Sequence, residues 1–190
     1  MKKIISLFKR NYEGDRLVYD EIVLGAEWVV SGQGIATRKW DGTCCMVRDG
    51  RLYKRYDRKQ DKRSGKHKIA PPGWEAAQQE ADQKTGHWPG WVPVGNGPED
   101  RWHRDAINSI TPDGTYELCG PKVQGNPEGL DRHVLIPHGR HFLPAIPVTF
   151  GALKNVLAAM DIEGIVWHHP DGRMVKIKGR DFGLERKKSR

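Results

Sequence analysis

Lys39-Trp40-Asp41-Gly42 is the first of four short motifs that follow one another in a particular order along this 190-residue chain. Each motif adjoins residues typical of β-strands. A Lys-x-Asp-Gly turn by itself occurs by chance in many proteins, whereas the ordered set of four indicates one site built from distant segments. The other three are Tyr116-Glu117-Leu118-Cys119-Gly120, Glu163-Gly164-Ile165-Val166 and Lys176-Ile177-Lys178.

These residue types suit the attack of a lysine on a nucleoside triphosphate. A free lysine has a pKa near ~10.4, so at pH 7 only roughly one side chain in a few thousand is a neutral nucleophile. Nearby cations or partial desolvation lower that pKa. Lys176 and Lys178 are two residues apart in a predicted strand, so their side chains point the same way. Such a pair by itself would indicate a strand face exposed to solvent. Together with the three upstream motifs, it favours a strand face that binds the phosphate groups.

The chain resembles the covalent nucleotidyltransferase superfamily of ATP-dependent DNA and RNA ligases and mRNA capping enzymes. The resemblance is strongest to a small family of 5′-3′ RNA ligases that includes the vertebrate cytosolic enzyme. It extends from about Thr37 to Leu184 and is weakest between Lys59 and Ser109. The segments that carry it are Lys39-Trp-Asp-Gly-Thr-Cys-Cys45, Arg55-Tyr-Asp-Arg-Lys59, Gly125-Asn-Pro127, His133-Val-Leu-Ile-Pro-His-Gly139 and Glu163-Gly-Ile-Val-Trp-His168.

The chain length suits one domain over residues 1–190, with an insert of unknown role at about 60–108, and no C-terminal OB-fold is expected. The resemblance implies an α+β nucleotidyltransferase (adenylation) domain with antiparallel sheets and flanking helices. It also implies that Lys39 becomes a lysyl-AMP, with Glu117 on the ribose and Glu163 on a catalytic Mg²⁺ or Mn²⁺ ion. Such hard cations suit carboxylate and phosphate oxygens. Lys176 and Lys178 would bind the α-phosphate and balance the charge of the leaving pyrophosphate.

Further residues are assigned to the nucleotide by the same resemblance. Asp41 and Gly42 form the turn that presents the lysine, and Thr37 and Arg38 occupy positions where relatives contact the adenine. One arginine is expected on the nucleotide or on the RNA 5′-phosphate, and one apolar or aromatic side chain on the base. The candidates are Arg55, then Arg58, for the first role, and Leu135 or His133 for the second.

The predicted function is an ATP-dependent RNA ligase that joins RNA 5′-phosphate and 3′-hydroxyl ends, as in RNA repair, through a lysyl-AMP and an RNA-adenylate. One alternative is a capping guanylyltransferase or DNA ligase. Only twelve residues follow Lys178, too few for the OB-fold that most of those enzymes add. A second alternative is a non-catalytic nucleic-acid-binding module, which uses basic residues and scattered aromatics.

Local patterns predict mostly strands. Strands are expected over residues 17–30, 35–38, 115–119 and 133–136. Hairpins are expected around Asp49-Gly50 and around Pro170-Asp171-Gly172. Residues 150–160 carry apolar side chains at helical spacing, and a helical patch is expected at 74–83. The histidines at 138, 141, 168 and 169 lack zinc-type spacing, which favours packed or solvated side chains.

A basic segment and a tryptophan-rich segment follow the first hairpin. Residues 51–68 contain nine Lys or Arg against two Asp and predict an RNA-backbone contact at Lys62, Arg63 and Lys66. The four tryptophans between residues 71 and 108 indicate either a lid or substrate-facing surface, or a long loop packed onto the body.

Composition narrows the class of protein. The net charge of +8 favours an anionic partner, here RNA. No apolar run could span a bilayer, and the first ten residues do not match a secretory signal. Three cysteines, two of them adjacent, indicate reduced thiols and a cytoplasmic location. No obligate protein partner is evident from the sequence.

Overall fold

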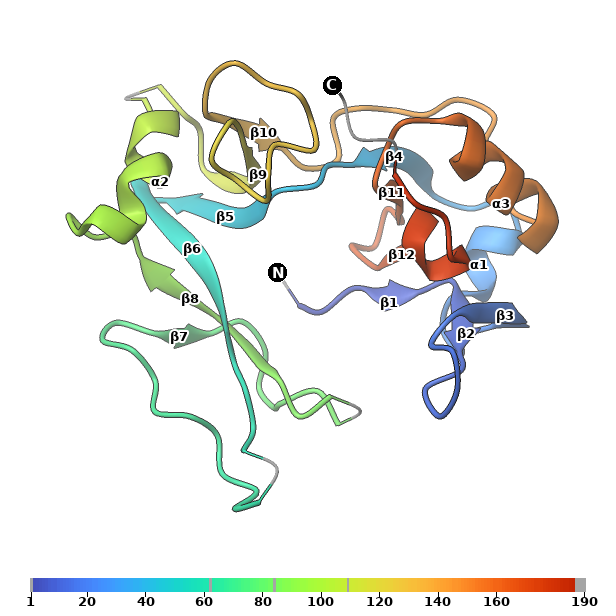
Figure 1. Ribbon diagram of the computed structural model, residues 1–190, viewed down its shortest axis with the longest axis horizontal. Coiled ribbons are helices and arrows are strands. Elements are labelled where there is room, and N and C mark those ends of the chain that lie inside the picture. Colours follow the sequence, from blue (N-terminus) through green and yellow to red (C-terminus); the bar gives the residue numbers. More distant parts are fainter. Residues whose placement is uncertain (1, 62, 84, 109, 187–190) are drawn as a thin grey trace. The chain divides into compact units, whose positions relative to one another are not determined.

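The computed structural model describes residues 2–61, 63–83, 85–108 and 110–186, which form two compact units (Figure 1). The described parts of Met1–Lys3 and Gly42–Pro137 form unit 1, and those of Ile4–Asp41 and His138–Arg190 form unit 2. Each unit has its own cluster of buried apolar side chains.

Unit 2 is built on a four-stranded sheet in the order β1-β12-β11-β4. β1 pairs with β12 in parallel, and the other two pairings are antiparallel. The strands are β1 (Ile5–Ser6), β4 (Ile35–Lys39), β11 (Gly164–His168) and β12 (Met174–Lys178). β2 (Phe8–Arg10) and β3 (Val18–Ile22) form a separate antiparallel pair.

One face of this sheet is apolar and the other is polar. Ile165, Val175 and Ile177 are fully buried and belong to the core cluster of unit 2. α3 (Phe150–Ala159) adds the buried side chains Leu153 and Leu157 to the same cluster, so the helix predicted from apolar spacing is confirmed. Because strand side chains alternate, the remaining positions of β11 and β12 project from the opposite face.

Unit 1 is a six-stranded antiparallel sheet in the order β10-β9-β5-β6-β8-β7. The predicted hairpin at Asp49-Gly50 is confirmed, because both residues have positive φ (52° and 68°), as a two-residue primed turn requires. The strands are β5 (Thr43–Arg48), β6 (Arg51–Arg58), β7 (Glu75–Ala76), β8 (Trp88–Pro93), β9 (Gly114–Cys119) and β10 (Val134–Pro137).

The insert at about 60–108 is part of the unit 1 sheet. β8 pairs with β6 over six residues, and β7 pairs with β8 (Figure 1). Trp91 on β8 is 4% exposed, and Trp74 donates its indole N–H to the Tyr56 carbonyl. Packing onto the body therefore accounts for these two tryptophans. The insert ends in the 3₁₀ helix η1 (Pro98–Asp100) and the short helix α2 (Arg101–Ala106).

Two local predictions were wrong. Residues 17–30 form β3 and then the helix α1 (Glu27–Val30) instead of strands only. Burial of Trp28 and Val29 in the unit 2 core overrides the strand preference of this branched sequence. Residues 74–83 contain β7 and no helix. The Trp74 ring packs edge-on against the Trp88 ring of β8, so this segment is held by strand β8 and does not form a helix.

The structure is of mixed α and β class, with mostly antiparallel sheets and few helices, as the sequence predicted. The single nucleotidyltransferase domain expected over residues 1–190 stays a prediction. Among the described residues, no helix is long and apolar enough to cross a bilayer.

Candidate active site

The Glu163 carboxylate lies between two lysines on the polar face of the unit 2 sheet. Gly164, the first residue of β11, pairs with Lys39 on β4 and with Lys178 on β12. Glu163 directly precedes it. Lys39 Nζ lies 2.5 Å from Glu163 Oε2, and Lys178 Nζ donates to Oε1 of the same carboxylate. Three of the predicted catalytic residues therefore meet at one point, although 124 residues separate Lys39 from Glu163.

Gly164 permits this close approach of strands. A Cβ atom at this position would lie 2.1 Å from the Ile177 carbonyl oxygen and 2.8 Å from Lys178 Cα. Both are backbone atoms, which cannot rotate away as a flexible side chain would. Any larger residue would therefore have to displace β12 and its lysines.

Burial and mutual charge shift the protonation equilibria of this group. The side chains of Lys39, Glu163 and Lys178 are 18%, 10% and 13% exposed. Burial by itself raises the pKa of Glu163, but the two ammonium groups outweigh it and hold that pKa below its ordinary value. Burial, and then the neighbouring Lys39 charge, lower the pKa of Lys178.

Lys176 extends the cationic group by one step along β12. Val175 and Ile177 point into the core, so Lys176 and Lys178 share the polar face, as the period of two predicted. Burial, followed by the charges of Lys178 and Lys39, lowers the pKa of Lys176 to about 8. The site therefore stores unfavourable positive charge, which a bound anion would relieve.

Thr37 lies on the same polar face, two residues before Lys39. Its side chain is 2% exposed, and its Oγ1 donates to the Val166 carbonyl at 3.2 Å. Oγ1 is also 3.0 Å from Nε2 of His168. Burial, and then His138, lower the pKa of His168. The sequence predicted a packed or solvated side chain for His168. Its contact with Thr37 was not predictable, because it depends on the register of β4 with β11.

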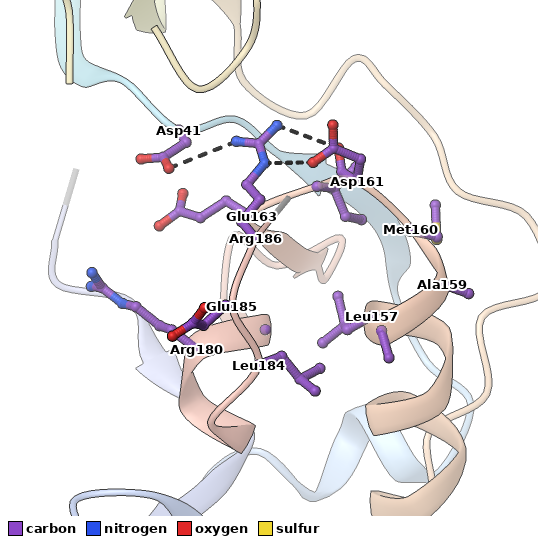
Figure 2. A pocket seen from close by; sticks show the side chains of 13 residues that line it. Asp41, Leu157, Ala159, Met160, Asp161, Glu163, Arg180, Leu184, Glu185 and Arg186 are labelled. Atoms are coloured by element: carbon purple, nitrogen blue, oxygen red, sulfur yellow. Dashed lines mark hydrogen bonds and ion pairs between the residues drawn. The ribbon is translucent and has the colours of Figure 1, made fainter. Parts of the chain in front are cut away.

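Arg38 and Asp41 flank the lysine differently. Arg38 alternates to the opposite side of β4, where its guanidinium lies 3.9 Å from the centroid of the Trp40 ring. Asp41 lies in a pocket of unit 2 (Figure 2), together with Asp161 and Arg186. Burial, and then the charge of Glu163, raise the pKa of Asp41, while Arg186 opposes the rise.

Glu117, the remaining one of the five predicted catalytic residues, lies in unit 1. It is 7% exposed on β9, opposite Cys44 on β5 and Ile136 on β10. Its Oε1 accepts the Gly42 amide N–H at 3.2 Å. A Cβ at residue 42 would lie 2.1 Å from the Leu118 carbonyl oxygen, which explains the glycine of the Lys-x-Asp-Gly motif.

The two candidate arginines lie on opposite faces of the unit 1 sheet. Arg55 continues the register that pairs Cys45 with Lys54, which places it beside Cys44 on the Glu117 face. Its guanidinium lies 5.3 Å from the centroid of the Trp91 ring.

Arg58 lies on the other face and has a structural environment. Its guanidinium is 4.9 Å and 5.5 Å from the ring centroids of Trp74 and Trp88. It also donates to the Lys68 carbonyl at 2.9 Å. These contacts fasten the tryptophan-rich segment to β6, so Arg58, which the sequence ranked after Arg55, has a structural environment of its own.

The two residues proposed to contact the base also lie away from Glu117. Leu135 pairs with Leu118 and packs against the unit 1 core. His133 stacks on Trp102, with ring centroids 4.6 Å apart. Ile136 on β10 lies directly opposite Glu117 and on the same face of the sheet. Sequence reasoning missed it because the register of β10 with β9 was unknown.

The predicted RNA-backbone residues lie in the loop after β6. Arg63 and Lys66 are exposed, while Lys62 lies outside the described residues. Asp61 accepts the backbone N–H groups of Arg63 and Ser64 and so forms the turn that presents them.

The chain is similar in sequence to known proteins over most of its length. The sequence profile of the RNA ligase 1 family matches residues 109–189, a stretch that includes Glu117, Glu163 and both β12 lysines. The protein named RNA ligase 1 from Pongo abelii is 30% identical over 79% of this chain and 67% of its own length. The proteins of that name from Danio rerio and Mus musculus are 30% and 28% identical, with the same coverage.

The chain belongs to the RNA ligase 1 family. This membership confirms the prediction of a ligase enzyme of the RNA ligase class. Lys39 lies before the region that the RNA ligase 1 profile matches, so its connection to that region rests on the geometry: the contact with Glu163 and the pairing with Gly164.

Proposed function

We propose that the chain is an ATP-dependent RNA ligase with a nucleotidyltransferase fold, which joins an RNA 5′-phosphate to a 3′-hydroxyl. The observation that carries this proposal is the buried group of Lys39, Glu163 and Lys178 in a member of the RNA ligase 1 family. A single domain over residues 1–190 and a cytoplasmic location are parts of the same proposal.

The first step is the attack of Lys39 Nζ on the α-phosphorus of ATP. An N–P bond forms, the bond to the bridging oxygen breaks, and pyrophosphate leaves. Lys39 must be neutral to attack, yet its contact with Glu163 stabilises the ammonium form. The Lys39 proton therefore has to leave to solvent before the bond forms.

The residues present fit a divalent metal ion. Glu163 offers carboxylate oxygens, the donors that Mg²⁺ and Mn²⁺ prefer. Mg²⁺ or Mn²⁺ bound there would compete with Lys39 for the carboxylate and neutralise phosphate charge. The depressed pKa of Glu163 means that it is ionised and available as a ligand at neutral pH.

Lys176 and Lys178 would bind the α-phosphate and offset the charge of the leaving pyrophosphate. Both project from one face of β12 and are partly removed from water. Preorganised cations in such an environment stabilise developing charge more than they would in bulk water. A bound phosphate would in turn relieve the repulsion that depresses the pKa of Lys176.

Residues of the unit 1 sheet complete the assignment. Glu117 would accept hydrogen bonds from the ribose hydroxyls. Arg55 is the arginine assigned to the nucleotide or the RNA 5′-phosphate, because it shares the Glu117 face and Arg58 does not. For the same reason Ile136 replaces Leu135 as the apolar contact for the base. In unit 2, buried Thr37 supports the predicted adenine contact better than Arg38 does.

Two further transfers follow from the lysyl-AMP. An oxygen of the RNA 5′-phosphate attacks the α-phosphorus, which breaks the N–P bond and regenerates Lys39. The 3′-hydroxyl then attacks the activated 5′-phosphorus and displaces AMP. Each transfer depends mainly on positioning and charge neutralisation. Lys62, Arg63 and Lys66 are assigned to the RNA backbone.

The test is a sealing assay with defined ends and nucleotides. We expect joining of RNA that carries 5′-phosphate and 3′-hydroxyl ends, with ATP and Mg²⁺, and no joining when the 5′ end is a hydroxyl. Joining of DNA but not RNA would indicate a DNA ligase. Transfer of GMP to a 5′-diphosphate RNA would indicate a capping enzyme. RNA binding with no covalent transfer from either nucleotide would indicate the non-catalytic alternative.

A further inference from the structure

We propose that Arg186 is a positioning residue for the Lys39 nucleophile, because its guanidinium ties the segment that follows Lys39 to the segment that precedes Glu163. The inference rests on the proposed lysyl-AMP chemistry and adds a residue that neither the four motifs nor the composition indicated. Arg186 belongs to the polar segment after η2 (Gly179–Phe182).

Figure 2 shows the Arg186 guanidinium between two carboxylates from different parts of unit 2. Its Nε donates to Asp161 Oδ1 at 3.0 Å, and its Nη2 donates to the Asp161 carbonyl at 3.3 Å. Its Nη1 lies 3.7 Å from Asp41 Oδ2. The Arg186 side chain is 17% exposed, so it is largely enclosed and is not a solvated surface arginine.

These contacts lie just beyond the end of the sheet where the reacting groups meet. β4 ends at Lys39 and β11 begins at Gly164, and these two residues pair. The register of β4 with β11 ends at this pair. Asp41 comes two residues after Lys39, and Asp161 comes two residues before Glu163. Arg186, through its contacts with Asp41 and Asp161, forms a clamp between these two segments. This clamp therefore holds the segments of Lys39 and Glu163 together beyond the end of the strand pairing.

Charge gives the clamp a second role. Asp41, Asp161 and Glu163 all line this pocket, and like charges at short range repel. Arg186 offsets two of these carboxylates and leaves Glu163 to the lysines. The planar guanidinium can serve two acceptors at once, whereas a lysine presents a single point of charge. A displacement of about 1 Å of a reacting group can cost on the order of 100-fold in rate.

The experiment measures single-turnover adenylylation of the full chain at several ATP concentrations. We expect Arg186→Ala to lower the maximal rate about 10- to 100-fold, with the half-saturating ATP concentration changed by less than about twofold, because Lys176 and Lys178 remain. Arg186→Lys should restore part of the rate. The matched control is Arg173→Ala, the loss of an exposed arginine that pairs with Asp171 in the turn between β11 and β12 and does not line this pocket.

A double-mutant cycle separates positioning from general stability. Asp161→Asn should lower the maximal rate in the wild-type background and have little further effect in the Arg186→Ala background. Asp161 is 49% exposed, so Asp161→Asn should fold normally. It therefore tests the Arg186–Asp161 contact even if Arg186→Ala folds poorly. Additive losses, or an Arg186→Ala rate within about twofold of wild type, would overturn the inference. A wild-type protein that takes up no AMP would refute the proposed function itself.

Discussion

Lys39 Nζ lies 2.5 Å from Glu163 Oε2, so the proposed nucleophile and the proposed metal ligand are ion-pair partners. The charges of Lys39 and Lys178, which shares the same carboxylate, hold the pKa of Glu163 below its ordinary value against the effect of burial. The contact links metal binding at Glu163 to deprotonation of Lys39. Any group that draws the Glu163 carboxylate away from Lys39 also makes that lysine easier to deprotonate.

Loss of either β12 lysine should slow the first chemical step. We expect Lys176→Ala and Lys178→Ala each to reduce the adenylylation rate by at least ~100-fold, the scale of removing one preorganised electrostatic group. The measurement is single-turnover labelling of the protein by ATP. Lys154→Ala, on the exposed side of α3, is the matched control. Rates near wild type for either β12 variant would show that this face does not bind the phosphates.

Lys176 should make stability depend on pH. Its pKa is about 8 when folded and 10.5 when unfolded. Between these values the unfolded chain holds the proton that the folded protein has lost, so this residue makes stability rise with pH. The charged form costs the folded state at most roughly 3 kcal/mol below pH 8.

Lys176→Met should therefore gain most over wild type at pH 7, and this gain should shrink by pH 10. Urea unfolding at both pH values measures the difference, and Lys154→Met controls for the loss of an exposed lysine. A gain that is the same at pH 7 and pH 10 would contradict the prediction.

Gly164→Ala should damage the site and the fold together. The added Cβ would meet the Ile177 carbonyl oxygen at 2.1 Å and force β12 away from β11. We expect a destabilisation of about 1–3 kcal/mol, as for overpacking elsewhere, with loss of Lys39 labelling at a temperature where the variant is folded. Gly151→Ala is the control. A Cβ there has open space on α3, so helix propensity should raise stability by up to about 1 kcal/mol. A Gly164→Ala protein with normal labelling would contradict the tight pairing at this point.

The loop after β6 should contribute to RNA binding and not to self-adenylylation. Replacing Lys62, Arg63 and Lys66 together by alanine should reduce the slope of log affinity against log salt. With roughly 0.7 per phosphate contact on single strands, three contacts correspond to about 2 in the slope. Lysyl-AMP formation should be unchanged. An unaltered slope would mean that these residues are an ordinary solvated loop and that the RNA is held elsewhere.

Local sequence predicted the parts of the fold that depend on local chemistry. Asp49-Gly50 gave the first hairpin, because a two-residue turn needs two positive φ angles. The alternation of Lys176 and Lys178 gave their common face. The helix α1 was missed because its burial in the core, and not its branched residues, determines its conformation.

The relations between distant segments were not predictable from one sequence. The four motifs named Lys39, Glu117, Glu163 and both β12 lysines, but strand register had to show which of them touch. The same limit explains why the sequence ranked Arg55 ahead of Arg58 without placing them on opposite faces, and why Ile136 was overlooked. Arg186 lies in a short polar segment with no motif, so its two carboxylate partners were visible only in three dimensions.

The most direct measurement of the central claim is intact-mass spectrometry of the protein after incubation with ATP and Mg²⁺, with little exposure to acid. Wild type should gain the mass of one AMP through a phosphoramidate that acid cleaves and base spares, and Lys39→Ala should gain nothing. An unlabelled wild type, or a Lys39→Ala protein labelled to the same extent, would contradict the assignment of Lys39 as the nucleophile.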